Sequence, residues 1–260
     1  MPDFYDLMQA NLAAFLLMMT RISGIFIVSP VLGSMNVSVL FRAGMALAFT
    51  FLLFPVLDDG SVTAPDTVAM FAASVAAELF IGWLIGLAAY MVLSAISMAG
   101  KVMDMQVGFA MVNVMDPTSG QQIPLIGSFL YNLSIIVLLV TNGHHIIISA
   151  LVESFRIVPV LGMSWDPVVT NIVASMATGI FLTGMKIAMP VIFANFLTNV
   201  GLGILARTMP QLNIFVVGMP MHVIIGLGVL AMMMPFYVLF LDVVFNDVYK
   251  NIYLLLHGLE

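Results

Sequence analysis

Long apolar runs separated by short polar stretches dominate the chain. Turn residues delimit six apolar blocks, at 12–32, 43–57, 68–99, 123–140, 168–200 and 214–241. A helix needs about 20 apolar residues to cross a bilayer, so the block at 43–57 is too short to span upright, whereas those at 68–99 and 168–200 are long enough to bend or to project beyond the bilayer. The pattern therefore predicts an all-α integral membrane protein whose helices differ in length.

Capping residues and prolines add detail to these helices. Asp66 is placed to cap the helix that begins at 68, and Asp166 with Pro167 forms an N-cap followed by proline at the first helical position. Proline inside a helix removes a backbone hydrogen bond and bends the axis. We expect this effect at four prolines inside the apolar blocks, namely Pro30, Pro190, Pro220 and Pro235. We therefore expect kinked helices, covered by protein or water where backbone groups are freed.

The tail after residue 241 has a different pattern. Its polar residues recur at helical spacing, with valine, phenylalanine, tyrosine and leucine on the opposite side; they are Asp242, Asn246, Asp247, Lys250 and Asn251. This is typical of an amphipathic helix that lies against a membrane surface or a partner.

Composition supports a membrane protein and excludes other classes. Hydrophobic residues make up 62% of the 260 residues and charged residues 8%, against about a quarter charged in soluble domains. The absence of cysteine excludes disulfides and thiolate metal sites, and the net charge of −6 argues against a nucleic-acid partner. Because no Lys or Arg precedes Arg21, we expect the first apolar segment to stay in the mature protein.

Catalytic signatures are absent from the sequence. His144 and His145 are adjacent, so on a helix they point about 100° apart, whereas a zinc-binding pair is spaced i, i+4. Asn142 and Gly143 favour a turn at a helix end instead. No nucleophile, nucleotide or dinucleotide motif is found. We therefore expect a protein that is not an enzyme and that carries no cofactor, metal or catalytic residue.

Three charged residues lie well inside the apolar blocks: Arg21, Glu78 and Lys186. Such a charge costs about 2.5–3.5 kcal/mol at the centre of a membrane helix, so it normally faces a partner or water. Either a proton relay or ion site, or a structural ion pair or subunit contact, would explain them. Gly82 and Gly86 form a G-x-x-x-G pattern, which lets another helix approach closely.

The stretch GKVMDMQVGFAMVNVMDPTSGQQ at 100–122 interrupts the apolar pattern. Gly108 permits tight or left-handed backbone, and Asp116 with Pro117 begins a type I turn. Between them lies apolar bulk that a wet connector does not need, supplied by Phe109, Met111, Val114 and Met115. From the residues alone, 108–122 is either a solvated loop between helices or a segment with a function of its own.

Three ordered stretches resemble one family. They are RISGIFIVSPVLG from residue 21, AGKVMDMQVGFAMVNVMDP at 99–117 and NVGLGILARTMPQLNIFVVGMP at 199–220. Together they are similar to the FliR family of flagellar export-gate proteins, whose relatives serve in virulence type III secretion. The resemblance implies kinked helical hairpins in three parts, which are a FliP-like N-terminal part at 1–160, a FliQ-like helical hairpin at 161–241 and an amphipathic C-terminal helix at 242–260.

The resemblance also implies a function and partners. It implies a structural and gating subunit of the flagellar type III export gate in the bacterial inner membrane, within the basal body. Expected partners are FliP-type and FliQ-type subunits, a FlhB-type subunit, a surrounding FliF-type ring and unfolded export substrates. Residues 108–122 would form a pore loop that closes the channel, with Lys101 and Asp104 at its base.

Subunit contacts follow by the same analogy. Arg207, Pro210 and Gln211 would form a contact at the hairpin turn, and Arg21, Glu78, Gly82, Gly86 and Lys186 would face other subunits. A plain helix–turn–helix connection is the alternative for the turn. The alternative for the whole protein is a small-molecule or ion secondary transporter, favoured by broken helices and buried charges; no internal repeat supports it.

Overall fold

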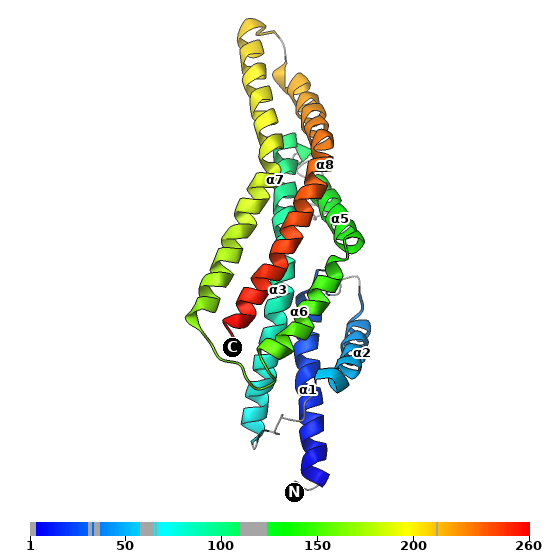
Figure 1. Ribbon diagram of the computed structural model, residues 1–260. Helices are drawn as coiled ribbons and strands as arrows, with labels where there is room; N and C mark the ends of the chain where they lie inside the picture. The colour runs from blue at the N-terminus through cyan, green and yellow to red at the C-terminus, as the bar shows by residue number, and fades with distance from the viewer. Residues whose placement is uncertain are drawn as a thin grey trace. The chain divides into compact units, whose positions relative to one another are not determined.

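A computed structural model of the chain describes residues 4–30, 33, 37–57, 65, 67–109, 124–211 and 213–260, and of residues 4–11 the backbone alone. Within these ranges the chain forms α-helices and no strand, which confirms the predicted all-α fold (Figure 1). The helices are α1 (Phe4–Val28), α2 (Val39–Leu57), α3 (Val68–Val107), α5 (Leu125–Val140), α6 (Gly143–Ile157), α7 (Pro167–Thr208) and α8 (Ile214–His257).

Four of the described helices, α2, α3, α7 and α8, are long and apolar enough to cross a membrane, and a fifth span results if α5 and α6 form one broken span. The protein is an all-α integral membrane protein. The prediction that the second block is too short was wrong, because α2 begins at Val39 and has 19 residues. Its start is fixed by Ser38, whose hydroxyl oxygen accepts a hydrogen bond from the N–H of Phe41 at 3.3 Å.

Several helices run further than the apolar pattern indicates. α3 continues past residue 99 to Val107, α7 continues past 200 to Thr208, and α8 continues without a break from Ile214 to His257. Polar residues in these extensions do not stop the helices, because straight-chain polar residues such as lysine, glutamine and arginine are compatible with a helix. The helix α6 was not predicted, since its polar first turn hides it from a search for apolar blocks.

Local signals at helix ends were predicted with mixed success. The side chain of Asp166 accepts a hydrogen bond from the N–H of Val168 at 2.8 Å, and Pro167 is the first residue of α7, as predicted. Asp66 lies outside the described residues, and Thr67 Oγ1 accepts a bond from the N–H of Met70 at 3.2 Å. Pro30 lies beyond the end of α1 and not inside a helix, because α1 ends at Val28.

The other three predicted proline positions lie inside helices. Pro190 is within α7, and Pro220 and Pro235 are within α8. Pro55, which the pattern analysis did not single out, lies inside α2. Each of these prolines leaves one carbonyl of its helix without an intrahelical donor.

The chain forms two compact units. Unit 1 comprises Met1–Met91, Asn142–Met176 and Phe245–Glu260, and unit 2 comprises Val92–Thr141 and Ala177–Val244. The helices α3, α7 and α8 each contribute to both. The three parts implied by the resemblance stay a prediction.

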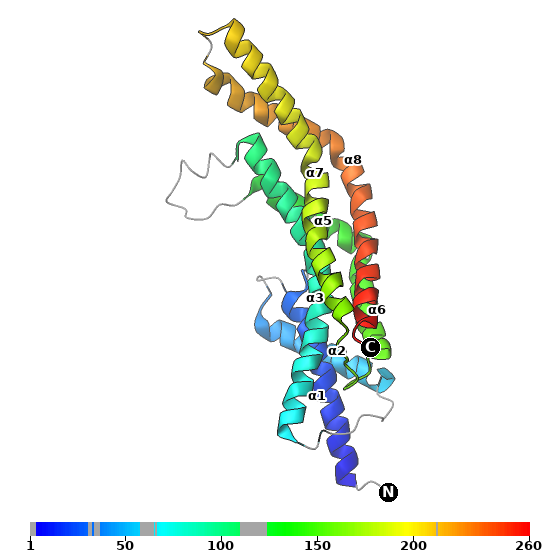
Figure 2. The ribbon, with the colours of Figure 1, turned by 90° about the vertical axis from the view of Figure 1, so that its left-hand side faces the viewer.

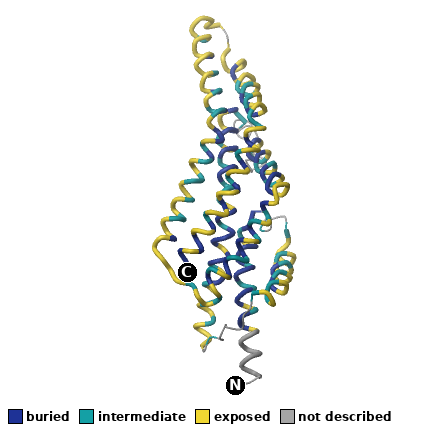
Figure 3. Tube along the Cα trace, in the orientation of Figure 1, coloured by how far each residue is buried: buried dark blue, intermediate teal, exposed yellow. Residues whose placement is uncertain are grey.

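Unit 1 is built around α1 and the first half of α3. α2 packs on α1 through two aromatic contacts, Phe15 with Phe54 and Phe26 with Phe49, yet much of its length is exposed (Figure 3). The C-terminal end of α8 belongs to this unit. Its apolar stripe is buried by the chain itself, at Phe245, Val248, Ile252, Leu255 and Leu256. The amphipathic pattern was predicted correctly, but part of what covers it is the protein's own fold.

Unit 2 contains the second half of α3, α5 and a helical hairpin. The hairpin consists of α7 from Ala177 and α8 up to Val244, joined by a short turn after Thr208, and its two helices lie side by side in both views (Figures 1 and 2). Its outward residues near the turn are exposed and largely apolar, among them Ile204, Met209, Phe215 and Val216.

Candidate functional site

Two buried polar clusters stand out, one in each unit. The ion-pair cluster, in unit 1, consists of Arg21, Glu78, Ser154, Phe155 and Val158. The loop-base cluster, in unit 2, consists of Gly100, Asp104, Gly108, Ile126 and Gly127, and it lies on both sides of the segment 110–123.

Arg21 and Glu78 pair directly inside the chain. The Arg21 side chain is 0% exposed and that of Glu78 2%, and Nε of Arg21 donates to Oε2 of Glu78 at 2.5 Å. Nη1 of Arg21 also donates to the carbonyl oxygens of Ser154 and Val158, each at 2.8 Å. The guanidinium carbon lies 4.3 Å from the centre of the Phe155 ring. The desolvated cation is therefore held by a carboxylate, two carbonyls and an aromatic face.

The second oxygen of Glu78 holds a backbone segment. Oε1 accepts a hydrogen bond from the N–H of Leu161 at 3.2 Å. Leu161 has φ 71°, a left-handed conformation that a leucine rarely adopts. The carboxylate thus connects α3 both to α1 and to the turn that precedes α7.

Close helix packing makes the ion pair possible. A Cβ atom on Gly24 would lie 2.6 Å from the carbonyl oxygen of Leu79, and one on Gly82 would overlap the carbonyl of Arg21. A Cβ atom on Gly86 would lie 3.1 Å from the carbonyl oxygen of Ile25. The predicted G-x-x-x-G face is therefore the surface on which α1 crosses α3.

The structure thus brings four predicted contact residues together within the chain: Arg21, Glu78, Gly82 and Gly86. Among the interpretations left open for the buried charges, a structural ion pair is the one that fits Arg21 and Glu78. Their contact with another subunit stays a prediction. The other predicted contact residues are exposed in unit 2, namely Lys186, Arg207, Pro210 and Gln211.

At the loop base, α3 ends at a glycine. Gly108 has φ 96°, a Cβ atom added to it would meet no other atom within 4 Å, and its N–H donates to the carbonyl of Asp104 at 3.2 Å. This is the usual way in which a left-handed glycine ends a helix. Phe109, the next residue, is half-buried.

The start of α5 lacks a cap of its own. The preceding residue, Pro124, makes no capping hydrogen bond with its side chain. Instead Asp104, on α3, accepts two bonds from the first turn of α5: Oδ1 from the N–H of Ile126 at 2.9 Å and Oδ2 from the N–H of Gly127 at 3.1 Å. These are the second and third helical residues, whose N–H groups an N-cap side chain normally binds.

The helices α3 and α5 touch backbone to backbone beside this cap. A Cβ atom on Gly100 would overlap the Cα of Gly127 and lie 2.7 Å from its nitrogen. Asp104 as a whole residue is 5% exposed, so its two bonds are shielded from water. Two glycines and one carboxylate therefore hold the ends of α3 and α5 together.

The hairpin contacts the end of α3 through a second polar group. The fully buried Asn195 donates from Nδ2 to the carbonyl of Gln106 at 3.3 Å, and its Oδ1 lies 3.2 Å from Nδ1 of His222. A cavity of about 500 Å³ adjoins this contact, lined by the last residues of α3 and by α7 and α8.

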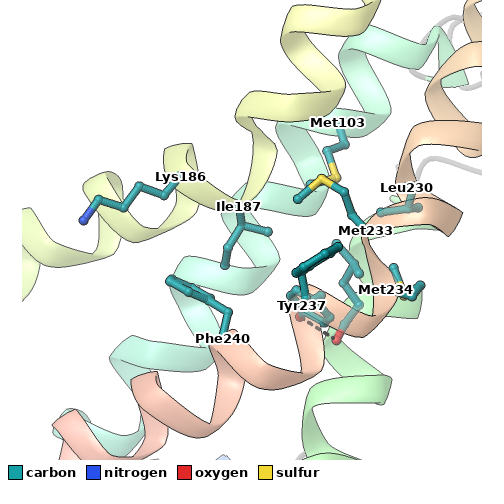
Figure 4. A pocket seen from close by; sticks show the side chains of 10 residues that line it. Met103, Lys186, Ile187, Leu230, Met233, Met234, Tyr237 and Phe240 are labelled. Carbon is teal, nitrogen blue, oxygen red and sulfur yellow. Dashed lines mark hydrogen bonds between the residues drawn. The ribbon is translucent and has the colours of Figure 1, made fainter.

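A smaller apolar pocket of about 190 Å³ lies between α3, α5, α7 and α8 in unit 2. Figure 4 shows Met103, Ile187 and Met233 around it, whereas the ammonium group of Lys186 points away. At its edge Tyr237 bonds through its hydroxyl to Ser134 Oγ at 2.7 Å and to the carbonyl of Leu130 at 3.3 Å. Methionine gives such a pocket an adaptable lining.

The predicted pore-loop residues are only partly visible. Gly108 and Phe109 belong to the described residues, while Met111, Val114, Met115, Asp116 and Pro117 lie outside them. The capping role of Asp104 and the buried position of Asn195 were not predicted. The one sequence feature that pointed to a role like that of Asp104 is Pro124. It precedes a helix but has no side-chain acceptor for the first N–H groups of that helix.

The histidine pair occupies the start of α6. Asn142 has a left-handed φ of 57° and precedes Gly143, the first residue of α6, which confirms the predicted turn. The rings of His144 and His145 lie 4.2 Å apart. In the part of the chain that the structure describes, no group of three or more His, Asp or Glu residues is arranged to hold a metal ion.

Comparison with known proteins assigns the chain to a family. Residues 12–248 match the family model of Bacterial export proteins, family 1. Flagellar biosynthetic protein FliR of Bacillus subtilis is 34% identical over 224 residues, which cover 85% of this chain and 86% of that protein. The FliR proteins of Escherichia coli (28% identical over 233 residues, 88% of this chain and 87% of that protein) and Aquifex aeolicus (27% over 239 residues, 92% of each) are similar over comparable lengths. The chain therefore belongs to the FliR family of bacterial export proteins.

Proposed function

We propose that this protein is a structural and gating subunit of the flagellar type III protein export gate, with no enzymatic activity. The observation that carries the proposal is similarity to proteins named flagellar biosynthetic protein FliR over most of both chains, at 34% identity with the Bacillus subtilis protein. The apolar helices support a place in a membrane. We propose the inner membrane, within the flagellar basal body, as its location.

The finer role proposed is a contribution to the channel for unfolded substrates and to its closure. Residues 108–122 would form the closing plug. Support comes from the loop base, where a carboxylate and two glycines join the helices on either side of the segment. Apolar side chains such as Phe109 and Met115 can close a narrow passage by excluding water, and flexible methionines can yield to a passing chain.

The proposed partners are FliP-type and FliQ-type subunits, a FlhB-type subunit and a FliF-type ring. We propose that the exposed residues Lys186, Arg207, Pro210 and Gln211 contact these subunits directly. A charge such as that of Lys186, exposed on an apolar helix, favours a polar partner over lipid. The ion-pair cluster would act from inside, by fixing α1 on α3. We also propose that the chain has three parts, which are a FliP-like part at 1–160, a FliQ-like hairpin at 161–241 and an amphipathic helix at 242–260.

Deletion of 108–122 tests the plug. The altered chain would be co-expressed with its two small membrane partners, purified as a complex and placed in a planar bilayer, where small-ion conductance is measured. We expect a leak that the wild-type complex lacks. A complex that assembles without the loop and stays closed would disprove the plug assignment.

A second variant separates closure from loop length. Replacing Phe109, Met111, Val114 and Met115 by serine keeps the chain length and removes the apolar bulk, so we expect a leak again. Replacing the exposed Met209, at the hairpin turn, by serine is the matched control, and we expect it to leave the complex closed.

The alternative function, a secondary transporter, loses part of its support. It rested on broken helices and on three charges inside the apolar blocks, and two of these charges, Arg21 and Glu78, pair with one another within the chain. Purification in mild detergent distinguishes the two functions. A monomer that transports alone would favour the transporter, and obligatory co-purification with two small membrane proteins favours the gate.

A further inference from the structure

The apolar pocket in unit 2 is suited to an apolar guest group. Its volume is about 190 Å³, and it is lined mainly by methionine, leucine, isoleucine and phenylalanine. The hydroxyl of Tyr237, at its edge, already bonds to Ser134 Oγ at 2.7 Å and to the carbonyl of Leu130 at 3.3 Å. An apolar cavity of this kind binds an apolar group in preference to water.

The pocket reaches the surface of unit 2. Phe236, which lines it from α8, is 69% exposed. Three of the lining residues are methionines, whose flexible side chains adjust to the shape of a guest, namely Met103, Met233 and Met234. A side chain from outside the protein can therefore enter the pocket.

Lys186 lies at the edge of this pocket. Its aliphatic stem contributes to the lining, whereas its ammonium group points away from the pocket (Figure 4). The residue is exposed, and no hydrogen bond or ion pair joins it to another of the described residues. The protein therefore places an unpaired cation directly beside an apolar pocket.

The position of Lys186 along α7 indicates what pairs with it. It is the only charged residue between Asp166 and Arg207, each of which is about 20 residues away, or roughly 30 Å along a helix. Lipid phosphates lie at the two edges of a hydrocarbon layer that is itself about 30 Å thick. A cation in the middle of such an apolar stretch is therefore suited to a carboxylate on a neighbouring protein helix, and not to a lipid headgroup.

We infer that the pocket and Lys186 together form a docking surface for a helix of another subunit, which inserts a large apolar side chain into the pocket and pairs an Asp or Glu carboxylate with the lysine. Residues three or four apart on a helix lie on one face, about 5–6 Å apart. This spacing suits a cation whose own stem lines the pocket. The inference rests on the proposed function, and it adds the chemistry of the partner's surface at this contact.

Reversing the charge of Lys186 tests the carboxylate. The protein is co-expressed with its two small membrane partners and purified through an affinity tag in mild detergent, and the amount of each partner retained is measured. Lys186→Glu puts a like charge beside the carboxylate, so we expect retention of the docked partner to fall about tenfold or more. Lys186→Arg keeps the charge and should retain it. Lys250→Glu, the same change at another exposed lysine, is the matched control and should retain it too.

Thermal unfolding of the protein without its partners separates docking from a role in the fold. Because Lys186 is exposed, Lys186→Glu should leave the unfolding temperature at the wild-type value. A lowered unfolding temperature would overturn the inference, and so would equal partner retention in Lys186→Glu and Lys250→Glu.

Filling the pocket tests the apolar side chain of the partner. Ile187→Phe places more of the protein's own bulk in the pocket, and Ile136→Phe makes the same change at an exposed position on α5 as the control. We expect partner retention to fall in the first variant alone. Met233→Trp fills the pocket from α8 if Ile187→Phe fails to fold.

Bound phospholipid is measured in the same preparations. Loss of phospholipid from the filled variant, with full retention of both membrane partners, would show that an acyl chain occupies the pocket. That result would overturn the inference.

A zero-length cross-link identifies the residue that pairs with Lys186. A carbodiimide joins a lysine to a carboxylate in direct contact with it through an amide bond, and mass spectrometry of the assembled complex locates the joined peptides. We expect Lys186 to be joined to an Asp or Glu of another subunit, three or four residues from a large apolar side chain. A product within its own chain alone, or no product in the intact complex, would contradict the inference.

The same purification separates this inference from the function on which it rests. A wild-type protein that retains neither membrane partner refutes the proposed function and the inference together. A wild-type protein that retains both, with Lys186→Glu retaining them equally well, refutes the inference alone.

Discussion

The ion-pair cluster and the loop-base cluster use a buried carboxylate in different ways. Glu78 binds a full positive charge, the guanidinium of Arg21, which is 57 residues earlier in the chain. Asp104 meets two backbone N–H groups. Both carboxylates connect helices at a point where glycines allow close contact.

The difference lies in what remains when a partner is lost. Removing one side chain of the ion pair leaves a charge buried in a low-dielectric interior, which is very costly. Removing Asp104 leaves two amides at a helix end, which cost less and affect one junction. The ion-pair cluster is therefore suited to holding the fold, and the loop base to holding one connection.

The largest expected effect comes from breaking the ion pair. Arg21→Met should lower the free energy of unfolding by about 3–5 kcal/mol, because Glu78 is left charged and buried. Chemical unfolding in detergent, followed by circular dichroism, measures the loss. The double variant Arg21→Met/Glu78→Leu should recover most of it, since well-packed apolar residues often replace a buried pair without loss. A double variant less stable than the single one would contradict this account of the cluster.

Smaller effects are expected from crowding the helix crossings in the two clusters. Gly82→Ala and Gly100→Ala each place a methyl group into the backbone of the neighbouring helix, so we expect a loss of about 1–3 kcal/mol for each in the same unfolding experiment. Gly44→Ala is the control, because no atom lies within 4 Å of its added methyl group; higher helix propensity should stabilise it by up to about 1 kcal/mol. If Gly82→Ala were as harmless as Gly44→Ala, the close crossing of α1 and α3 would be refuted.

The smallest effect is expected from an ion pair at the surface of unit 1. Arg156 Nη1 lies 3.6 Å from Glu153 Oε2, and the two side chains are 67% and 37% exposed. Arg156→Ala should therefore change the free energy of unfolding by less than about 0.5 kcal/mol. Measured beside Arg21→Met, it tests whether burial, and not charge pairing as such, gives the ion-pair cluster its importance. A loss similar to that of Arg21→Met would remove the distinction.

Local signals predicted local structure well. The start of α7 at Asp166 and Pro167 and the turn at Asn142 were predicted because the determining residues are neighbours in sequence. The all-α membrane fold was predicted because a bilayer imposes a length and an apolar composition that are visible in the chain. The ends of α3 and α7 were placed too early, because loss of apolar character was taken as loss of helix. The tail after residue 241 was predicted to be a helix of its own, whereas it continues α8.

Tertiary partners were harder to predict. The sequence left an ion pair open for its buried charges, but nothing local in it could show that Arg21 meets Glu78 while Lys186 stays exposed. The role of Asp104 was hidden further, because its partners are backbone amides that any residue type supplies. The apolar stripe around Phe245 was visible in the sequence, but the parts of the same chain that bury it were not.

The two contacts of Asp104, one through its backbone and one through its side chain, have a consequence for the connection between α3 and α5. Since Asp104 bonds to residues at the end of α3 and in the first turn of α5, contacts outside the connecting chain join these two helix ends. Lengthening a closed loop is thermodynamically inexpensive, at about 0.6 kcal/mol for each doubling. A change in the length of that connection should therefore leave the contact between the two helix ends, made by Gly100, Asp104 and Gly127, in place.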